Sequence, residues 1–157
     1  MPTIYLETLI KATPKDCFQL CLNVDLHQIS TKQTSETIVG GIRQGRLTLG
    51  DTVTWKAKHF GVWQYLTVQI TQEEPFSYFC DEMLKGTFKS MKHEHLFEVK
   101  GDETLMKDIF HFESPFGILG EFVNWLFLTN YMEKFLIERN RLIQTVAESS
   151  EKGKFLS

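Results

Sequence analysis

Apolar and polar side chains alternate along most of the first 113 residues. Successive residues of a strand point to opposite faces of a sheet, so this alternation predicts strands that each bury one face. Turn residues separate the later segments, which favours antiparallel neighbours. The seven predicted strands span residues 3–11, 35–41, 52–58, 62–70, 76–84, 91–99 and 104–113.

A short helix is predicted after the first strand. Thr13 suits the N-cap of a helix, Pro14 suits its first turn, and Asp16 suits its positive end. Residues 23–30 are compatible with either a second short helix or an irregular corner.

The period of the pattern changes after residue 117. From Leu119 to Val146, apolar residues recur at intervals of three and four, which predicts a helix of about thirty residues, roughly 45 Å long. No other predicted element is long enough to cross the sheet, so we expect the sheet to bury one face against this helix. We expect a single domain over residues 1–148 and a frayed tail over 149–157.

The composition indicates a globular domain and argues against some classes of partner. A chain of 157 residues can bury a real core, and its 13 phenylalanines suit a wide core or an apolar pocket. The formal net charge of −3, without a cluster of Lys and Arg, argues against a nucleic-acid partner. The chain shows neither a signal peptide nor an uncharged apolar run of 18 residues, so we expect no transmembrane segment.

The three cysteines provide no disulfide framework. Cys17, Cys21 and Cys80 form an odd, sparse set that is typical of a reducing compartment, so we expect a cytoplasmic protein. Cys17 and Cys21 lie one helical turn apart, which favours packing on a core face. We expect the chain to be a monomer or a weak homodimer.

The strand predicted over residues 91–99 carries the most informative pattern. His93 and His95 alternate with Lys92 and Glu94, so both imidazoles fall on the apolar face of the strand. Inward-facing imidazoles need partners, which can be water, carboxylates, a metal ion or a ligand. This strand therefore indicates a polar feature inside the domain.

Other polar side chains share the inner face. The alternation points Trp55, Gln64 and Asp108 inward, and the strand around residue 80 adds either Asp81 or Glu82, depending on its register. A dry core would leave such groups unpaired at a cost of about 1–3 kcal/mol each. A hydrated or ligand-filled cavity between sheet and helix removes this conflict, and a self-contained network of histidines and carboxylates is the alternative.

The same residues raise two chemical hypotheses. The two histidines with Asp81 and Asp108 are residue types that bind zinc or iron. A histidine beside a buried carboxylate can also move a proton near neutral pH. No cysteine pair, nucleophile motif or phosphate-binding loop accompanies them, so we expect no catalytic residue, no metal ligand and no cofactor.

The start of the long predicted helix, over residues 116–132, is apolar nearly all round. It is either buried between the sheet and a cavity, or it forms a surface that contacts a membrane or a second copy of the chain. Trp125 and Phe127 lie off the stripe that runs through Phe122 and Leu126. Some apolar surface is therefore expected to remain exposed.

The order of the elements and several short motifs resemble the START-like superfamily, also called SRPBCC or the helix-grip fold of the birch-pollen allergen. Within it, the chain is similar to small bacterial proteins of the polyketide cyclase/dehydrase-like group, related to a domain fused to epimerase-like proteins of the cell-division-inhibitor group. The motifs are VTWKAKHFG at 53–61, FCDEM at 79–83, HEHLFE at 93–98, TLMKD at 104–108 and PFGILG at 115–120, with DLH at 25–27.

This resemblance implies an α+β helix-grip fold. A seven-stranded antiparallel sheet would wrap around the C-terminal helix, with two short helices after the first strand and a deep apolar cavity inside. The expected function is binding of a small, mainly hydrophobic or amphipathic molecule in that cavity. The ligand-binding residues expected from the pattern and the resemblance are Trp55, Gln64, Leu66, Val68, Asp81, His93, His95, Phe97, Asp108, Phe110, Phe112 and Phe122.

Two other functions remain open at this point. One is an enzyme of the polyketide cyclase/dehydratase-like or hydrolytic kind, which would use a cavity histidine and a carboxylate as acid and base. The other is an interaction module that works through the C-terminal helix.

Overall fold

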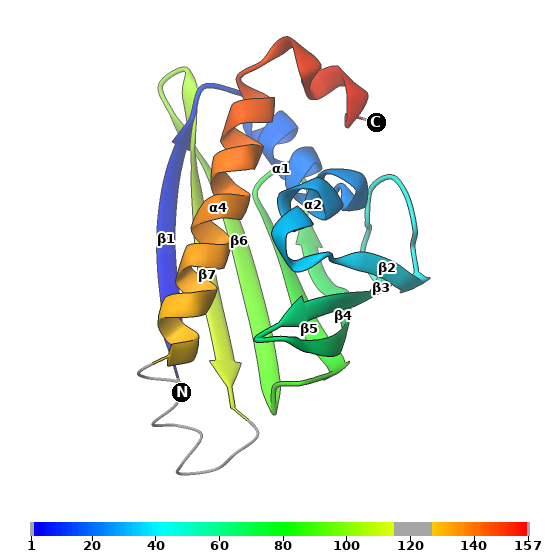
Figure 1. Cartoon of the computed structure of the whole chain (residues 1–157). Helices are drawn as coiled ribbons and strands as arrows, with labels where there is room; N and C mark the ends of the chain where they lie inside the picture. Colours follow the sequence, from blue (N-terminus) through cyan, green and yellow to red (C-terminus); the bar gives the residue numbers. More distant parts are fainter. Residues whose placement is uncertain (1, 115–126, 157) are drawn as a thin grey trace.

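The computed structural model describes residues 2–114 and 127–156 and shows a curved sheet around one long helix (Figure 1). Helices α1 and α2 lie together beside the C-terminal part of α4 (Figure 1). The described elements are β1 (Thr3–Ile10), α1 (Pro14–Leu22), α2 (Val24–Ser30), η1 (Lys32–Thr34), β2 (Thr37–Gly41), β3 (Thr52–His59), β4 (Val62–Glu74), β5 (Tyr78–Gly86), β6 (Ser90–Lys100), β7 (Glu103–Glu113), α4 (Thr129–Ala147) and η3 (Ser150–Lys154).

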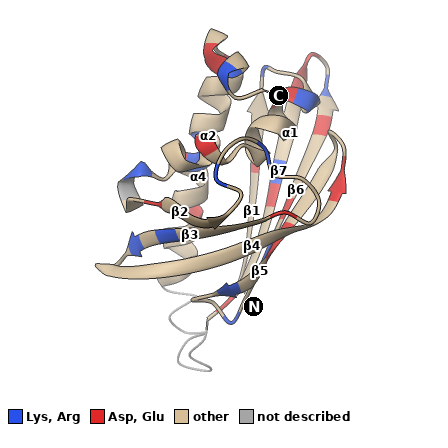
Figure 2. Ribbon diagram, turned by 90° about the vertical axis from the view of Figure 1, so that its right-hand side faces the viewer, with Lys and Arg blue, Asp and Glu red and all other residues tan. Residues whose placement is uncertain are grey.

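The seven strands form one antiparallel sheet in the order β1-β7-β6-β5-β4-β3-β2. The predicted seven-stranded antiparallel sheet is therefore confirmed. Register breaks between β4 and β5 and between β2 and β3 bend the sheet, since an extra residue in one strand raises its local twist. Acidic and basic residues occur on the strands and on the helices alike (Figure 2).

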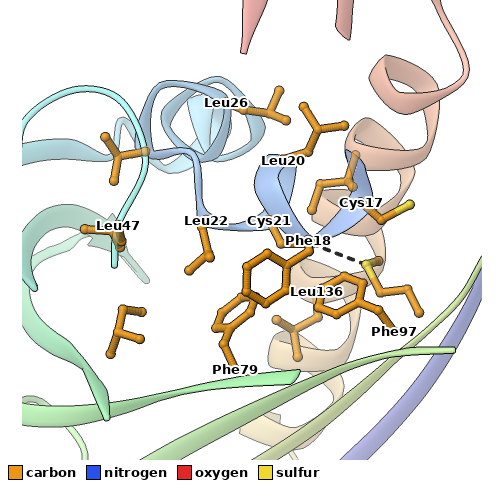
Figure 3. Packing of buried hydrophobic residues seen from close by; sticks show 14 of the residues in the cluster. Cys17, Phe18, Leu20, Cys21, Leu22, Leu26, Leu47, Phe79, Phe97 and Leu136 are labelled. Carbon is orange, nitrogen blue, oxygen red and sulfur yellow. Dashed lines mark hydrogen bonds between the residues drawn. The ribbon is translucent and has the colours of Figure 1, made fainter. Parts of the chain in front are cut away.

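Helix α1 begins at the N-cap that the sequence predicts, and one of its side chains lies at the centre of the core. Thr13 Oγ1 accepts a hydrogen bond from the backbone N–H of Asp16 at 3.1 Å. Phe18 is fully buried, and its ring meets those of Phe79 and Phe97 edge to face at centroid distances of 5.6 Å (Figure 3). Edge-to-face pairs add to the free energy of apolar burial, so these contacts hold α1 against β5 and β6.

The segment that was compatible with a helix or a corner forms the helix α2. Asn23 Oδ1 accepts a hydrogen bond from Leu26 N at 2.9 Å, which is the interaction of an N-cap residue. Asp25 Oδ2 accepts one from Gly45 N at 3.0 Å. Both short helices expected after the first strand are thus present, and α2 is tied to the loop that precedes β3.

The end of the chain differs from the frayed tail expected. Residues 150–154 form the short helix η3, and Phe155 and Leu156 pack against the core. Asn23 Nδ2 donates a hydrogen bond to Phe155 O at 3.1 Å, and Lys152 Nζ lies 2.9 Å from Asp16 Oδ2. The tail folds because distant parts of the chain supply these partners, which local periodicity does not reveal.

The long predicted helix is described in part. Helix α4 spans Thr129–Ala147 and is preceded by a π-helical turn at residues 127–128. Phe122, Trp125 and Leu126 lie outside the described residues. Phe127 is 67% exposed, in line with its place off the buried stripe. No helix in the described ranges combines the length and apolar character that a membrane crossing needs.

We expect Phe18→Ala to lower the free energy of unfolding by about 3–5 kcal/mol, because it leaves a cavity beneath α1. Urea unfolding followed by circular dichroism measures the change. The control is Leu49→Ala, because Leu49 is 59% exposed and its truncation should cost under about 0.5 kcal/mol. Equal losses in the two variants would contradict the assignment of Phe18 to the centre of the core.

Candidate functional site

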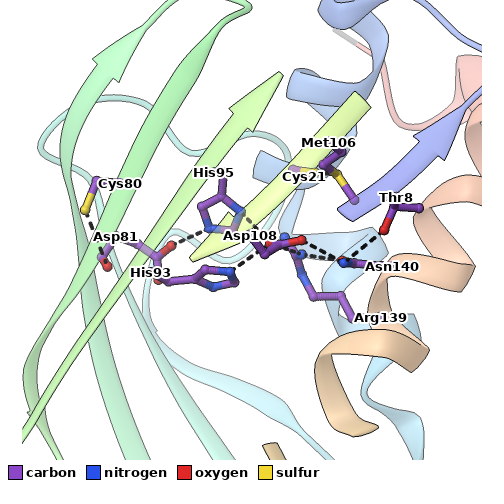
Figure 4. A network of polar contacts seen from close by, with 10 residues as sticks. All are labelled: Thr8, Cys21, Cys80, Asp81, His93, His95, Met106, Asp108, Arg139 and Asn140. Atoms are coloured by element: carbon purple, nitrogen blue, oxygen red, sulfur yellow. Dashed lines mark hydrogen bonds and ion pairs between the residues drawn. The ribbon is translucent and has the colours of Figure 1, made fainter. Parts of the chain in front are cut away.

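A network of polar side chains crosses the inner face of the sheet (Figure 4). On β6, His93 and His95 both point inward, as the alternation predicts, and their ring centroids lie 3.8 Å apart. His93 Nε2 is 2.8 Å from Asp108 Oδ1 on β7, and His95 Nε2 is 2.8 Å from Asp81 Oδ1 on β5. Each imidazole therefore forms a hydrogen bond with a carboxylate on a different neighbouring strand.

The structure settles which carboxylate of β5 faces inward. Asp81 pairs in register with His93, and its side chain reaches His95, so Asp81 is the inner residue and Glu82 is not. Phe79 shares the inner face and stacks on His95 at a centroid distance of 4.0 Å. The apolar residues of this strand fitted both registers, and the polar pairing decides between them.

Asp108 lies at the centre of the network and is completely buried. Its Oδ2 accepts a hydrogen bond from Asn140 Nδ2 at 2.7 Å, and Arg139 Nη1 is 3.5 Å from Oδ1. Burial raises the pKa of Asp108, but the hydrogen bond from His93 and the close approach of the His95 ring outweigh burial and hold this pKa well below its ordinary value. Asp108 is therefore an anion that joins β7 to α4.

Burial lowers the pKa of His93, because desolvation disfavours the charged form of an imidazole. Desolvation, reinforced by the neighbouring His95, lowers the pKa of His93 from 6.5 to about 4, although its bond to Asp108 acts in the other direction. Burial also raises the pKa of Asp81, but the hydrogen bond from His95 outweighs it and the net shift is downward. At neutral pH the network contains a neutral His93 between two carboxylate-bearing strands.

His95 has one ring nitrogen in a hydrogen bond and one that is not. Its Nδ1 lies 3.3 Å from Asp108 Oδ1, but the geometry is not that of a hydrogen bond, and this buried atom has no such partner among the described residues. Asp81, His93 and His95 also bring one potential metal-ligand atom each within 4.8 Å of one another. The 2.8 Å contacts of both imidazoles are hydrogen-bond distances, so the geometry is that of a histidine–carboxylate network.

A small cavity of about 70 Å³ lies against this network. It has room for a few water molecules, since one water needs about 10–15 Å³. Its polar wall includes Asp81, His93, His95 and Arg139, and Trp55 forms part of its apolar wall. The cavity is therefore a small, partly polar space.

A second cavity of about 450 Å³ lies between β3, β4 and the beginning of α4. Trp55 lines both cavities, with its indole 4.4 Å from the His27 ring. The wall of the larger cavity is mostly apolar and aromatic. It is formed by Glu36, Trp55, Ala57, His59, Phe60, Gln64, Tyr65, Leu66, Thr87, Phe88, Phe127, Leu128, Tyr131, Met132 and Phe135.

Some of the ligand-binding residues predicted from the sequence line the larger cavity, and others line the smaller one. The larger cavity is lined by Trp55, Gln64 and Leu66. The smaller cavity is lined by Trp55, Val68, Asp81, His93 and His95.

Four predicted residues line neither cavity. Phe97 packs under α1 with Phe18, and Asp108 is enclosed behind the histidines. Phe110 and Phe112 are buried in the core, where their centroids lie 5.6 Å apart. Inward orientation on a strand thus places a side chain in the interior but does not distinguish core from cavity. Phe122 lies outside the described residues.

Several residues of the larger cavity were missed by sequence reasoning. His59 is the last residue of β3, Phe60 lies in the turn that follows it, and Glu36 precedes β2. His59 Nδ1 forms a hydrogen bond with the hydroxyl of Tyr131 on α4. Alternation does not indicate which residues of a turn line a cavity. The motif at 53–61 includes His59 and Phe60, but it does not indicate their role.

Comparison with known proteins identifies the architecture. No protein-family model and no curated protein matches the chain. Among solved structures, TTHA0849 from Thermus thermophilus has a TM-score of 0.71 at 16% identity, covering 93% of this chain and 99% of that chain. Major latex-like protein 151 from Panax ginseng has a TM-score of 0.67 at 20% identity, covering 94% and 98%. Ara h 8.0201 has a TM-score of 0.62 at 15% identity, covering 92% and 98%.

The chain has the helix-grip fold. The similarity extends over more than nine tenths of this chain, but identities of this size establish the fold alone. Membership of the START-like superfamily and of its polyketide cyclase/dehydrase-like subgroup stays a prediction. Within this helix-grip fold, the network and the two cavities occupy the space between the sheet and the helices.

The depressed pKa of His93 predicts that the free energy of unfolding falls as pH is lowered from about 6.5 to about 4. In this window the unfolded chain protonates His93 while the folded protein does not, so protons favour unfolding, by roughly 1–3 kcal/mol. Urea unfolding at several pH values measures the decline.

The variant His93→Gln should flatten this decline, since Gln does not titrate. The control is His111→Gln, which changes a partly exposed histidine on the other face of β7 and should retain the decline. The same pH dependence in His93→Gln and in the unchanged protein would contradict a neutral buried His93.

Proposed function

We propose that the protein binds a small, mainly hydrophobic molecule in the larger cavity. The observation that carries this proposal is the cavity volume of about 450 Å³. Sites for small molecules typically enclose about 300–1,000 Å³ and have mostly apolar walls with a few polar groups. Protein interiors are otherwise close-packed, so the side chains around such a space lack contacts that a ligand would supply.

The walls suggest how such a molecule would lie. Trp55 and Leu66 would contact its apolar body from β3 and β4, and Phe135 would do so from α4. Gln64 is a candidate for orienting a polar group. Its Oε1 accepts a hydrogen bond from Thr87 Oγ1 at 3.2 Å, and its Nε2 lies at the 3.5 Å limit from His59 O, so Gln64 can exchange weak internal bonds for a bond to a ligand.

The histidine–carboxylate network is left out of this proposal. Asp81, His93 and His95 line the smaller cavity, whose volume of about 70 Å³ is too small for the body of such a molecule. Their hydrogen bonds also hold β5, β6 and β7 together. We therefore assign the network a role in orienting the strands rather than in contacting the ligand.

Acid–base catalysis is the alternative function. Its support is the pairing of His95 with Asp81 at 2.8 Å on the wall of the smaller cavity. The paired groups face each other and not the larger cavity, where an apolar substrate would fit. Ligand binding is therefore the function that the geometry supports best.

The cysteines support the proposal of a cytoplasmic location. Cys17, Cys21 and Cys80 are free and buried. Burial raises the pKa of Cys21 to about 12, which makes its thiol a poor nucleophile. Free thiols enclosed in this way suit a reducing compartment.

We expect Ala57→Phe to abolish the binding of N-phenylnaphthylamine, a neutral apolar probe. Ala57 is buried in the wall of the larger cavity, so a benzyl side chain at this position would occupy the space of the ligand. Probe fluorescence during titration measures binding, and circular dichroism checks that the variant is folded.

The matched control is Val99→Phe, because Val99 is 68% exposed and does not line the cavity. This variant should bind the probe as the unchanged protein does. Saturable binding that survives Ala57→Phe would show that the probe occupies another place and would contradict the proposal.

A further inference from the structure

The larger cavity has an unusual distribution of charge. Glu36 is the one acidic residue among its described wall residues, and none of them is Lys or Arg. Residues 115–126, which lie outside the described residues, contain no Lys or Arg either. The described residues therefore provide no basic side chain to pair with a ligand anion in this cavity.

Glu36 is 8% exposed and keeps hydrogen-bonding capacity. Its Oε1 lies 3.1 Å from His27 Nε2, which accounts for one of its oxygens. A carboxylate has two oxygens and about four lone-pair positions, so it can accept further hydrogen bonds. His27 does not line the larger cavity.

The charge of Glu36 acts on other groups of the cavity wall. Burial raises the pKa of Tyr131, and the charge of Glu36 raises it further. Burial lowers the pKa of His59, with Glu36 opposing this shift in part. At about pH 8 the imidazole of His59 is therefore neutral, and Glu36 is left as the charged group of the described wall.

Aromatic rings surround the rest of the space. Trp55 contributes one from β3, Phe88 one from the connection after β5, and Tyr131 and Phe135 two from α4. The faces of aromatic rings are negative and attract cations, most strongly where water is excluded. The rings and Glu36 therefore favour a ligand charge of the same sign.

We propose that the larger cavity selects apolar molecules that carry an amine and rejects those that carry a carboxylate or a phosphate. This inference rests on the proposed binding function and adds the charge of the ligand to it. An ammonium group would pair with Glu36, whereas an anion would lose its hydration beside a like charge without a basic partner.

A matched series of probes tests this selection at about pH 8, where free histidines are neutral. Naphthylethylamine, naphthylethanol and naphthylpropanoate share one apolar body and differ in charge. We expect the amine to bind at least about tenfold more tightly than the carboxylate, with the alcohol between them. Isothermal titration calorimetry with the full chain measures the three dissociation constants.

The variant Glu36→Gln keeps an oxygen that can accept a bond from His27 but removes the charge. It should reduce the preference for amine over carboxylate to within about threefold. The control is Glu138→Gln, because Glu138 is exposed on α4 and also acts on Tyr131 but does not line the cavity. This variant should retain the preference.

The outcomes separate the two proposals. If none of the three probes binds, the proposed function fails and the selection fails with it. If the alcohol binds but the carboxylate binds as tightly as the amine, the binding function stands and the charge selection is wrong. This comparison needs only the unchanged protein, so it decides the question even where Glu36→Gln does not fold.

Discussion

The carboxylate of Asp108 is enclosed at the point where β6, β7 and α4 meet. It accepts hydrogen bonds from His93 at 2.8 Å and from Asn140 at 2.7 Å, and Arg139 lies 3.5 Å away. A buried carboxylate without such partners costs several kcal/mol, so the fold is stable only when all of these elements are in place together. Because Arg139 and Asn140 are neighbours on α4, their contacts fix both the position of the helix along the sheet and its rotation.

This anchor divides the space beneath α4 into a packed part and a hollow part. On one side, Phe18 of α1 fills the interior together with Phe79 and Phe97 (Figure 3). On the other side, Tyr131 and Phe135 of α4 face β3 and β4 across the larger cavity. The helices α1 and α2 cover only part of the sheet, and the bulged strands curve around the rest. The cavity is a consequence of this uneven coverage.

The alternation of side chains was sufficient to predict the sheet and the inward direction of His93 and His95, because strand faces follow from local periodicity. It did not decide the register of β5, since the apolar residues of that strand suited both faces. The bond between Asp81 and His95 joins residues from different strands, and such pairing has no local signature. The folded tail, with Phe155 against the core, was missed for the same reason.

The site was predicted less well than the fold, and the reason is physical. The same inward-facing pattern describes a core residue such as Phe112 and a cavity residue such as Leu66. Which of them borders empty space depends on where α1, α2 and α4 lie over the sheet. Glu36 precedes β2 and His59 is the last residue of β3, so both lie at the margin of an alternating segment, where the periodic signal is weak.

The separation of the polar network from the larger cavity limits how a ligand can be recognised. The histidines and carboxylates of β5, β6 and β7 form hydrogen bonds with one another, so they stabilise the sheet and do not offer the larger cavity a binding group. Apolar contact is proportional to buried area and has little direction, so it discriminates poorly among molecules of similar size. Molecules of similar size must then be distinguished by the few polar groups of the wall, and among the described residues of that wall Glu36 is the one with a carboxylate.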